Sequence, residues 1–228
     1  MDKNIKISVV IPTYEARGMG VAFLKQNLEA LKAQTFKDFE VIVSDNSKYF
    51  IQEQIEWLCA RYPFVKYYRN DKRVGLVQNL NYAMSLARGE LIKIIFQDDF
   101  LFHENALQDI VDNFKGNWMV TASESTNDGK NFNRPFYPKY TEGMHLGINT
   151  ISSPSVLTIR NEGHLLFDEN VIMLMDVCYY KDCYDKFGEP TILNKINVAN
   201  TVGNHQVSRN ITQNQLDEEI EYSRNKYK

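Results

Sequence analysis

The chain has 228 residues, of which 43% are hydrophobic and 24% are charged, and its formal net charge at pH 7 is −3. These values are typical of a globular protein with a sizeable core, and they exclude a bulk positive charge that would attract nucleic acid or an anionic membrane. The three cysteines, Cys59, Cys178 and Cys183, lack the spacing of a metal site and cannot all pair, which favours a reducing compartment.

The first half of the chain alternates strand and helix patterns. Apolar or β-branched runs predict strands at 6–11, 39–44, 65–68 and 91–95, the first of them ended by Pro12. Helical periodicity predicts helices at 21–33, 50–61 and 75–87. Strands that alternate with helices of this length indicate βαβ units and a mostly parallel sheet.

The second half is less regular. We predict helices at 104–114, 169–187 and 212–226, and strands at 118–122, 154–160 and 196–202. The segment 123–150 is rich in Asn, Gly, Thr and Pro, and we expect a long functional or mobile loop there. With no repeat and no linker in the sequence, we expect one α/β domain over 1–228, made of a nucleotide-binding half (about 1–103) and a variable half (about 104–228).

The N-terminal sequence MDKNIKISVV has no signal-peptide core, and no apolar run is long enough to cross a membrane. We therefore expect a cytoplasmic protein. Peripheral contact with a membrane surface is compatible with this expectation, and the oligomeric state is left open.

Three polar clusters follow predicted strands: PTYE at 12–15, SDNS at 44–47 and QDD at 97–99. Ligands of open α/β sheets bind beyond the carboxyl ends of the strands, so we expect the three clusters to converge at one edge. Each cluster alone fits turn or helix-cap chemistry equally well, because Asp, Asn and Ser favour both. Their joint placement favours a ligand site.

Asp98 and Asp99 are the strongest pair of candidates. Adjacent carboxylates repel each other, and a bound metal ion would relieve that repulsion. Hard oxygen ligands suit Mg²⁺ or Mn²⁺, whose coordination a diphosphate would complete. The alternative is a carboxylate that caps the helix predicted from 104, and the intervening residues 100–102 weaken it.

The segments VVIPTYEA, FEVIVSDNS and VGLVQNLNYAMSLARGELIKIIFQDDFL resemble, in this order and spacing, the N-terminal half of the inverting family-2 glycosyltransferases with the GT-A fold. The resemblance is clear over about 5–105 and continues more weakly through SSPSVLTIR and GNHQVSRN. It implies a Rossmann-like GT-A sheet flanked by helices, with a donor-binding first half and a mixed, smaller, acceptor-binding second half. Phe96 and Ser44 stand where the family often has aspartates, which reduces the carboxylates available to a metal.

The resemblance also implies roles for single residues. Asp45 would accept a hydrogen bond from N3–H of a uracil or thymine ring, since a carboxylate only accepts. Asp98 would contact the ribose or help to place the metal, and Asp99 would be the direct ligand of Mn²⁺ or Mg²⁺, bridging to the donor diphosphate. The other donor-binding residues would be Pro12, Thr13, Glu15, Arg73 and Gly75.

In the second half, the resemblance points to Asp176, in LMDVCYY, as the general base that takes the proton of the acceptor hydroxyl. Its apolar neighbours would raise the pKa of the carboxyl by desolvation. A surface or capping aspartate is the plain alternative, and Asp182 and Asp185 are further candidates on the same helix. His205, in GNHQVS, matches a position where many family members place a histidine near the metal and diphosphate, and a structural histidine is its alternative.

The sequence therefore predicts a metal-dependent inverting glycosyltransferase that uses a nucleotide-sugar donor, most simply a UDP-sugar. The expected acceptor is a carbohydrate or a glycolipid, with a modified nucleic-acid base less favoured. The aromatic stretch FNRPFYPKY at 132–140 fits an acceptor platform or a packed cover over the sheet. Two other functions stay open: a nucleotidyltransferase, for which PTYEARGMG offers only a faint phosphate loop, and a non-catalytic nucleotide-sugar-binding protein.

Overall fold

A computed structural model describes residues 5–72, 74–206, 209 and 211–228. The first half forms strands β1 (Ile7–Thr13), β2 (Phe39–Asp45), β3 (Val65–Arg69) and β4 (Leu91–Ile94), with helices α1 (Gly20–Lys32), α2 (Tyr49–Cys59) and α3 (Leu76–Ser85) between them. These elements match the predicted ones to within two residues at every start and end. β1 pairs in parallel with β2 and β4, and β2 pairs in parallel with β3.

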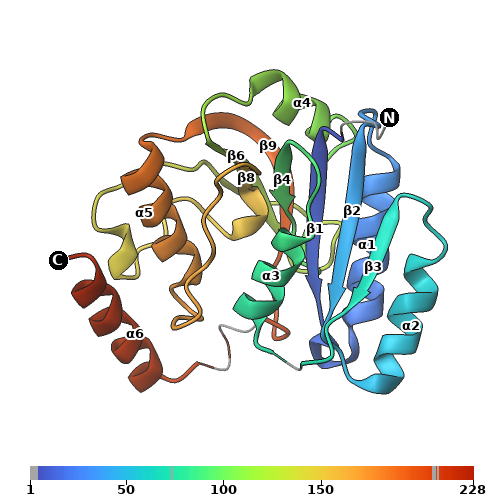
Figure 1. Cartoon of the computed structure of the whole chain (residues 1–228), viewed down its shortest axis with the longest axis horizontal. Coiled ribbons are helices and arrows are strands. Elements are labelled where there is room, and N and C mark those ends of the chain that lie inside the picture. Colours follow the sequence, from blue (N-terminus) through green and yellow to red (C-terminus); the bar gives the residue numbers. More distant parts are fainter. Residues whose placement is uncertain (1–4, 73, 207–208, 210) are drawn as a thin grey trace.

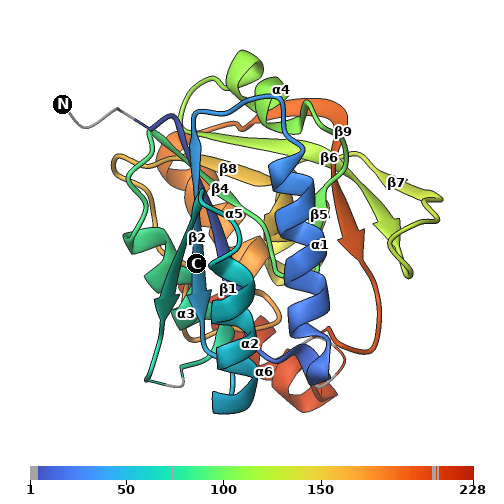
Figure 2. The same ribbon diagram turned by 90° about the vertical axis from the view of Figure 1, so that its right-hand side faces the viewer.

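The second half adds strands β5 (Phe100–Leu101), β6 (Trp118–Thr126), β7 (Arg134–Phe136), β8 (Leu157–Arg160) and β9 (Thr191–Thr201). Its helices are α4 (Ala106–Asn113), α5 (Met175–Phe187) and α6 (Gln213–Lys226). One nine-stranded sheet passes through both halves in the order β3-β2-β1-β4-β8-β6-β9-β5, with β7 paired to β6; Figure 1 labels most of these strands, and Figure 2 also labels β5 and β7. The strands of the second half pair in mixed directions, since β8 is antiparallel to β4 and β6 whereas β9 is parallel to β6.

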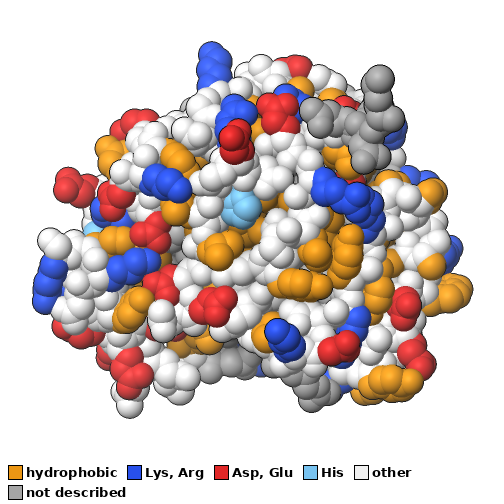
Figure 3. Space-filling view, in the orientation of Figure 1, with side chains coloured by type: hydrophobic (Ala, Val, Ile, Leu, Met, Phe, Trp, Pro, Cys, Tyr) orange, Lys and Arg blue, Asp and Glu red, His pale blue; other side chains and the backbone are white. Residues whose placement is uncertain are grey.

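Helices cover both faces of the parallel part of the sheet. Figure 2 shows α1 and α2 on one face of β1 and β2, and α3 on the other. The strands are buried from both sides, which explains why they read as nearly continuous apolar runs in the sequence. On the face shown in Figure 3, acidic and basic side chains are interspersed, in keeping with the net charge of −3.

Pro12 does not end β1, contrary to the sequence expectation: the strand continues to Thr13. The carbonyl of Val10 accepts a hydrogen bond from Ile95 N–H, so Val10 faces the β4 side of the strand. Pro12, two residues further on, faces the same side. β4 has already ended there, so the missing N–H of proline removes no ladder hydrogen bond.

Three boundaries in the second half differ from the predictions. β6 extends to Thr126 and β7 follows within the segment expected to be one loop, because β6 and β9 pair along a stretch that buries polar residues such as Ser123 and Glu124. β9 begins at Thr191, five residues before the predicted start at 196. The predicted strand at 154–160 begins as a 3₁₀ turn, Pro154–Val156, before β8.

The helix predicted at 169–187 begins only at Met175, as α5. Aromatic packing fixes this helix: the ring of Tyr180 stacks 6.2 Å from that of Trp118 on β6, and Tyr179 stacks 3.9 Å from Phe167. All four side chains are buried. α5 therefore begins at a fixed point beside the centre of the sheet.

α6, the last helix of the chain, lies beside α5 at the lower left of Figure 1. It begins with a capping box between Thr212 and Gln215. Ser223 donates to the carbonyl of His145 at 2.7 Å, and Tyr227 donates to a carboxylate oxygen of Asp182 on α5 at 2.9 Å. Across the residues that the structure describes, no helix is both long and apolar enough to span a bilayer.

Candidate active site

The carboxyl ends of β1, β2 and β4 lie at one edge of the sheet, because these neighbours are parallel. Two adjoining cavities open there. The first reaches from the QDD cluster to the start of α5 and is lined, among others, by Pro12, Tyr14, Phe96, Asp98, Asp99, Met173 and Asp176. The second is lined by Pro12, Thr13, Tyr14, Glu15, Asn46, Lys48 and neighbours of the α3 start. The edge thus carries all three predicted polar clusters.

Asp99 is buried, with 5% of its surface exposed. Its Oδ1 accepts the backbone N–H of Thr201 at 2.9 Å, and its Oδ2 accepts the amide of Asn200 at 2.9 Å and the hydroxyl of Ser153 at 3.3 Å. Burial and the charge of Asp98 raise the pKa of Asp99 to about 7. Asp99 thus joins the end of β4 to β9. Both of its carboxylate oxygens are already occupied by protein donors, and its predicted role as the direct metal ligand stays a prediction.

Asp98 is the more accessible carboxylate, with 23% of its side chain exposed, and its Oδ2 lies 2.9 Å from Nε2 of His205. The ion pair with Asp98 raises the pKa of His205, although burial opposes the shift. The histidine is fixed from two sides: its ring packs 4.6 Å from that of Phe23, and its carbonyl accepts the hydroxyl of Tyr14 at 3.1 Å. The sequence placed His205 near the metal and diphosphate, and the structure places it beside Asp98.

The Asp98–His205 pair fits a divalent cation. Nε2 of His205 is buried and makes no hydrogen bond of good geometry, although it lies within ion-pair distance of Asp98. Imidazole and carboxylate are both ligands of Mn²⁺, and the carboxylate also suits Mg²⁺. Among the residues described by the structure, no group of three or more His, Cys, Asp or Glu side chains is placed to hold a metal. Diphosphate oxygens and water would have to complete the coordination.

Asp176 is the second residue of α5 and lines the same cavity as Asp98. Its Oδ2 accepts the side-chain amide of Asn149 at 2.6 Å, and its Oδ1 accepts the backbone N–H of Val177 at 2.7 Å. Burial raises the pKa of Asp176 to about 6, even though these hydrogen bonds and the helix N-terminus favour the charged form. A carboxyl with this pKa is suited to accept a proton near neutral pH.

The two alternative bases on α5 lie elsewhere. Asp182 accepts hydrogen bonds from Lys226 and Tyr227 of the C-terminal segment at 2.9 Å each. Asp185 is paired with Lys181 one turn back on the exposed side of the helix. Neither residue lines the cavity that contains Asp98. Among the three aspartates considered on this helix, the position of Asp176 alone suits contact with an acceptor.

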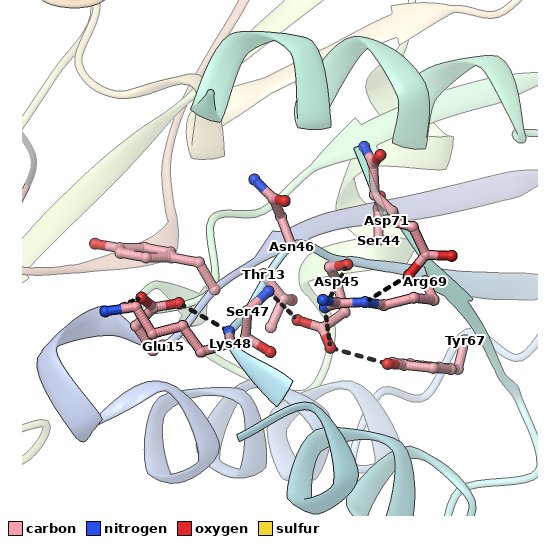
Figure 4. A network of polar contacts seen from close by, with 12 residues as sticks. Thr13, Glu15, Ser44, Asp45, Asn46, Ser47, Lys48, Tyr67, Arg69 and Asp71 are labelled. Atoms are coloured by element: carbon pink, nitrogen blue, oxygen red, sulfur yellow. Dashed lines mark hydrogen bonds and ion pairs between the residues drawn. The ribbon is translucent and has the colours of Figure 1, made fainter. Parts of the chain in front are cut away.

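Asp45, at the end of β2, is fully buried. Its carboxylate accepts the backbone N–H of Ser47 and the hydroxyl of Tyr67, each at 2.9 Å, and lies 3.5 Å from the guanidinium of Arg69 (Figure 4). Burial and the charge of Asp45 raise the pKa of Tyr67, which therefore remains a donor. The predicted contact of Asp45 with the base stays a prediction, and it would require the base to reach a carboxylate that already has three protein partners.

Glu15 and Thr13 line the second cavity at the end of β1. The carboxylate of Glu15 accepts the backbone N–H of Lys48 at 3.2 Å and pairs with its ammonium at 3.3 Å, so it links the β1 and β2 ends (Figure 4). Gly75 is the N-cap residue of α3, between the cavity residues Val74 and Leu76. Arg73, the remaining predicted donor residue, lies outside the described part of the chain.

Some contacts that hold the site together were not predicted from the sequence. Gln97 accepts the N–H of Tyr14 at 3.0 Å and donates to the carbonyl of Gly20 at 2.7 Å, so it joins the β4 end to the β1 loop. A Cβ at Gly20 would lie 2.3 Å from the carbonyl oxygen of Tyr14, which explains the glycine. Asn79 on α3 bonds Ser44 at the end of β2. The sequence showed Gln97 and Ser44 only as polar residues at strand ends, and it gave no signal for the roles of Gly20 and Asn79.

The aromatic segment 132–140 lies on and around β7, which pairs with residues 123–125 of β6. Phe132 packs edge-on against Phe102 at 5.1 Å between ring centroids, whereas Tyr137 is 56% exposed. None of the segment lines the cavity that holds Asp98 and Asp176. Of the two expectations for this segment, its position favours a peripheral cover over an acceptor platform.

Comparison with known proteins agrees with the geometry. The sequence model of the family described as "Glycosyl transferase family 2" matches residues 8–162. An uncharacterized glycosyltransferase of Methanocaldococcus jannaschii is 29% identical over 203 residues, which cover 80% of this chain and 66% of that protein. The chain spans between 26% and 66% of the length of the curated relatives it matches.

Two solved structures have a similar fold. S. aureus TarS in complex with UDP-GlcNAc has a TM-score of 0.71 at 16% identity, over 96% of this chain and 66% of that one. The mannosyltransferase PcManGT of Pyrobaculum calidifontis, in complex with GDP-Man and Mn²⁺, has a TM-score of 0.58 at 16% identity, over 89% of this chain and 59% of that one. At this level of identity the likeness establishes the α/β fold with a mixed, helix-flanked sheet.

Proposed function

The chain belongs to glycosyl transferase family 2, and from that premise we propose that it transfers a glycosyl group from a nucleotide-sugar, most simply a UDP-sugar, to an acceptor hydroxyl with inversion at the anomeric carbon. One observation carries the proposal: a single cavity is lined by Asp98 at the end of β4 and by Asp176 at the start of α5. The first faces the predicted donor side, and the second has the raised pKa of a base.

Inversion requires the acceptor oxygen to attack the anomeric carbon from the side opposite the diphosphate. In the proposed reaction Asp176 accepts the hydroxyl proton as the new carbon–oxygen bond forms and the bond to the diphosphate breaks. Asn149 and the N–H of Val177 hold the carboxylate in place, and Asp176 lines the cavity that would receive the acceptor. A carboxylate with a pKa of about 6 is mostly deprotonated at pH 7 and still a useful base.

The donor diphosphate would lie near Asp98 and His205, with the nucleoside in the second cavity between Thr13, Glu15 and Asn46. A divalent cation, Mn²⁺ or Mg²⁺, held by Asp98 and His205 would offset the negative charge that develops on the leaving diphosphate. The Mn²⁺ in PcManGT and the UDP-GlcNAc in TarS support these two parts of the proposal. We assign the protein's metal contact to Asp98 and His205, with Asp99 as the buried carboxylate that fixes the Asp98 turn.

A carbohydrate or glycolipid remains the proposed acceptor. Ile172 and Met173 line the cavity next to Asp176 and are 46% and 38% exposed, so an acceptor would meet apolar as well as polar surface there. Such a surface suits the apolar face of a sugar ring or the beginning of a lipid.

The test measures nucleoside diphosphate release from a panel of UDP-, GDP- and dTDP-sugars with Mn²⁺ or Mg²⁺. Release from one donor that increases with an added glycan or glycolipid supports the proposal. Pyrophosphate release from a nucleoside triphosphate would instead identify a nucleotidyltransferase. Tight UDP binding without turnover of any donor, across a broad set of acceptors, would identify a binding protein.

A further inference from the structure

Glu219 on α6 makes an unusual set of contacts for a surface-helix glutamate. Its Oε1 accepts the backbone N–H of Ile172 at 3.0 Å, and its Oε2 accepts those of Met173 at 2.8 Å and Leu174 at 2.9 Å. These are three successive amides directly before the first residue of α5, Met175. The charged acceptor satisfies donors at a helix N-terminus, where hydrogen bonds to a carboxylate are strong.

The three amides belong to the part of the chain that leads into Asp176. Ile172 and Met173 line the cavity, and Asp176 follows two residues after Leu174. The path of this segment sets where α5 begins and from which direction the Asp176 carboxylate enters the cavity. It also explains why α5 starts at Met175: the preceding amides are directed toward α6 rather than into a helical turn.

We propose that Glu219 is a positioning residue for the base: through the amides of 172–174 it clamps the start of α5, so that α6 is a working part of the acceptor side of the site. The proposal rests on the proposed function of Asp176. Glu219 itself touches no reacting atom. α6 is suited to this task because its last residue, Lys226, pairs with Asp168 at 3.0 Å and with Asp182 of α5 at 2.9 Å. These ion pairs hold α6 against α5.

Glu219 also acts on Asp176 through its charge. The groups around Asp176 are Asn149 from the loop before β8, the N–H of Val177 and the buried Tyr180 of α5, Glu219 of α6, and the carboxylates of Asp98 and Asp99 across the cavity. Burial is the main cause of the raised pKa of Asp176, and the negative charge of Glu219 adds to it. Removing that charge should therefore lower the pKa, whereas a clamp without charge would leave it unchanged.

The test compares Glu219→Gln with Glu218→Gln, which removes the same charge from the adjacent, exposed position of the same helix. Two readouts need no turnover: amide hydrogen exchange of 172–174, and titration of the Asp176 carboxyl in ¹³C-aspartate-labelled protein, assigned with Asp176→Asn. In Glu219→Gln we expect exchange at 172–174 to be at least about tenfold faster and the Asp176 midpoint to fall below the wild-type value near 6. Glu218→Gln should match the wild type in both. Unchanged exchange and titration in Glu219→Gln would overturn the proposal.

Should Gln at 219 prevent folding, Glu219→Asp keeps the charge on a shorter side chain. Faster exchange at 172–174 with an unchanged Asp176 midpoint is then expected, and unchanged exchange would overturn the clamp. With a known donor, Glu219→Gln should lower kcat several-fold, leave the KM for the donor unchanged and move the acid limb of the kcat profile to lower pH. A wild-type protein inactive with every donor would defeat the proposed function, while the exchange and titration data would still decide the clamp.

Discussion

Nε2 of His205 lies 2.9 Å from Oδ2 of Asp98, although β8 and β6 separate β4, which precedes Asp98, from β9, which precedes His205. His205 makes this contact four residues after the end of β9 at Thr201. Its return is fixed by Tyr14, whose hydroxyl donates to the His205 carbonyl, and by Phe23 of α1 against the ring. A carboxylate from the first half and an imidazole from the second thus meet beside the cavity that Asp98 lines.

Asp98→Asn should mainly lower ligand affinity, whereas Asp99→Asn should mainly lower stability. Asp98→Asn removes a charged ligand at the accessible position, so Mn²⁺-dependent UDP affinity should fall about tenfold or more while stability changes little. The Asp99 carboxylate accepts hydrogen bonds from three donors, and in Asp99→Asn an NH₂ group replaces one of the accepting oxygens. At least one buried donor then loses its acceptor, so the free energy of unfolding should fall by about 1–3 kcal/mol. Calorimetric titration with UDP and Mn²⁺, together with urea unfolding, separates the two outcomes. A loss of metal-dependent binding confined to Asp99→Asn would restore Asp99 as the metal ligand.

The parallel half of the fold could be predicted from the sequence because most of its strands are buried on both faces and its helices are amphipathic. β1, β2 and β4 are short, mostly apolar and buried runs followed by a polar cluster, whereas the edge strand β3 is half-buried and was visible through its valine and tyrosines. The second half was harder to predict because polar residues take core positions there. Ser123 and Thr121 in β6 and Asn197 in β9 are buried in the sheet, so neither strand shows its full length in the pattern of apolar residues.

The residue types of the site could be predicted from the sequence, but the hydrogen-bond partners of each side chain could not. The polar residues after β1, β2 and β4 had to meet once the strands were parallel. Which oxygen of which aspartate is free could not be predicted, because it depends on contacts such as Asn200 to Asp99 that join positions far apart in the chain. The contacts of Lys93 could not be predicted for the same reason. This lysine is fully buried within an apolar strand and donates to the carbonyls of Ser155 and Leu157, more than sixty residues away in the chain.

Transfer activity should rise with pH through about 6, since the pKa of Asp176 is raised to about 6 by burial and the base must be deprotonated. Below that pH the carboxyl carries the proton it has to accept, so kcat falls roughly tenfold per pH unit. Asp176→Asn, which keeps the shape but cannot accept a proton, should lower kcat by about 10²- to 10⁴-fold with UDP affinity unchanged. A pH profile of kcat for the wild type and UDP titrations of both proteins test this. Full transfer by Asp176→Asn would exclude it as the base.

Gly203→Ala should weaken the metal site through His205. A Cβ at Gly203 would lie 2.9 Å from both Cε1 and Nδ1 of the imidazole, so the ring must move away from Asp98 or the loop must shift. We expect Mn²⁺-dependent UDP affinity to fall about five- to tenfold, comparable to the loss of an outer contact at a metal site. The control is the double variant with His205→Ala: without the ring, the alanine at 203 should add no further loss. Additive losses in the double variant would show that the glycine acts on something other than the histidine.

Asp168 should link the stability of the C-terminal helix to pH. Burial opposes ionisation, but hydrogen bonds from the backbone and side chain of Asn170, from Lys226 and from Tyr222 lower the pKa of Asp168 to about 2. A carboxyl whose pKa is lower in the folded than in the unfolded chain adds stability that is fully present above about pH 4 and is lost as the pH falls toward 2. Asp168→Asn should therefore cost about 1–2 kcal/mol at pH 7 and almost nothing near pH 2, in urea unfolding followed at both pH values. Asp217→Asn, an exposed aspartate of α6, is the matched control and should change little at either pH. A cost for Asp168→Asn that is equal at both pH values would mean that Asp168 stabilises α6 by packing rather than by charge.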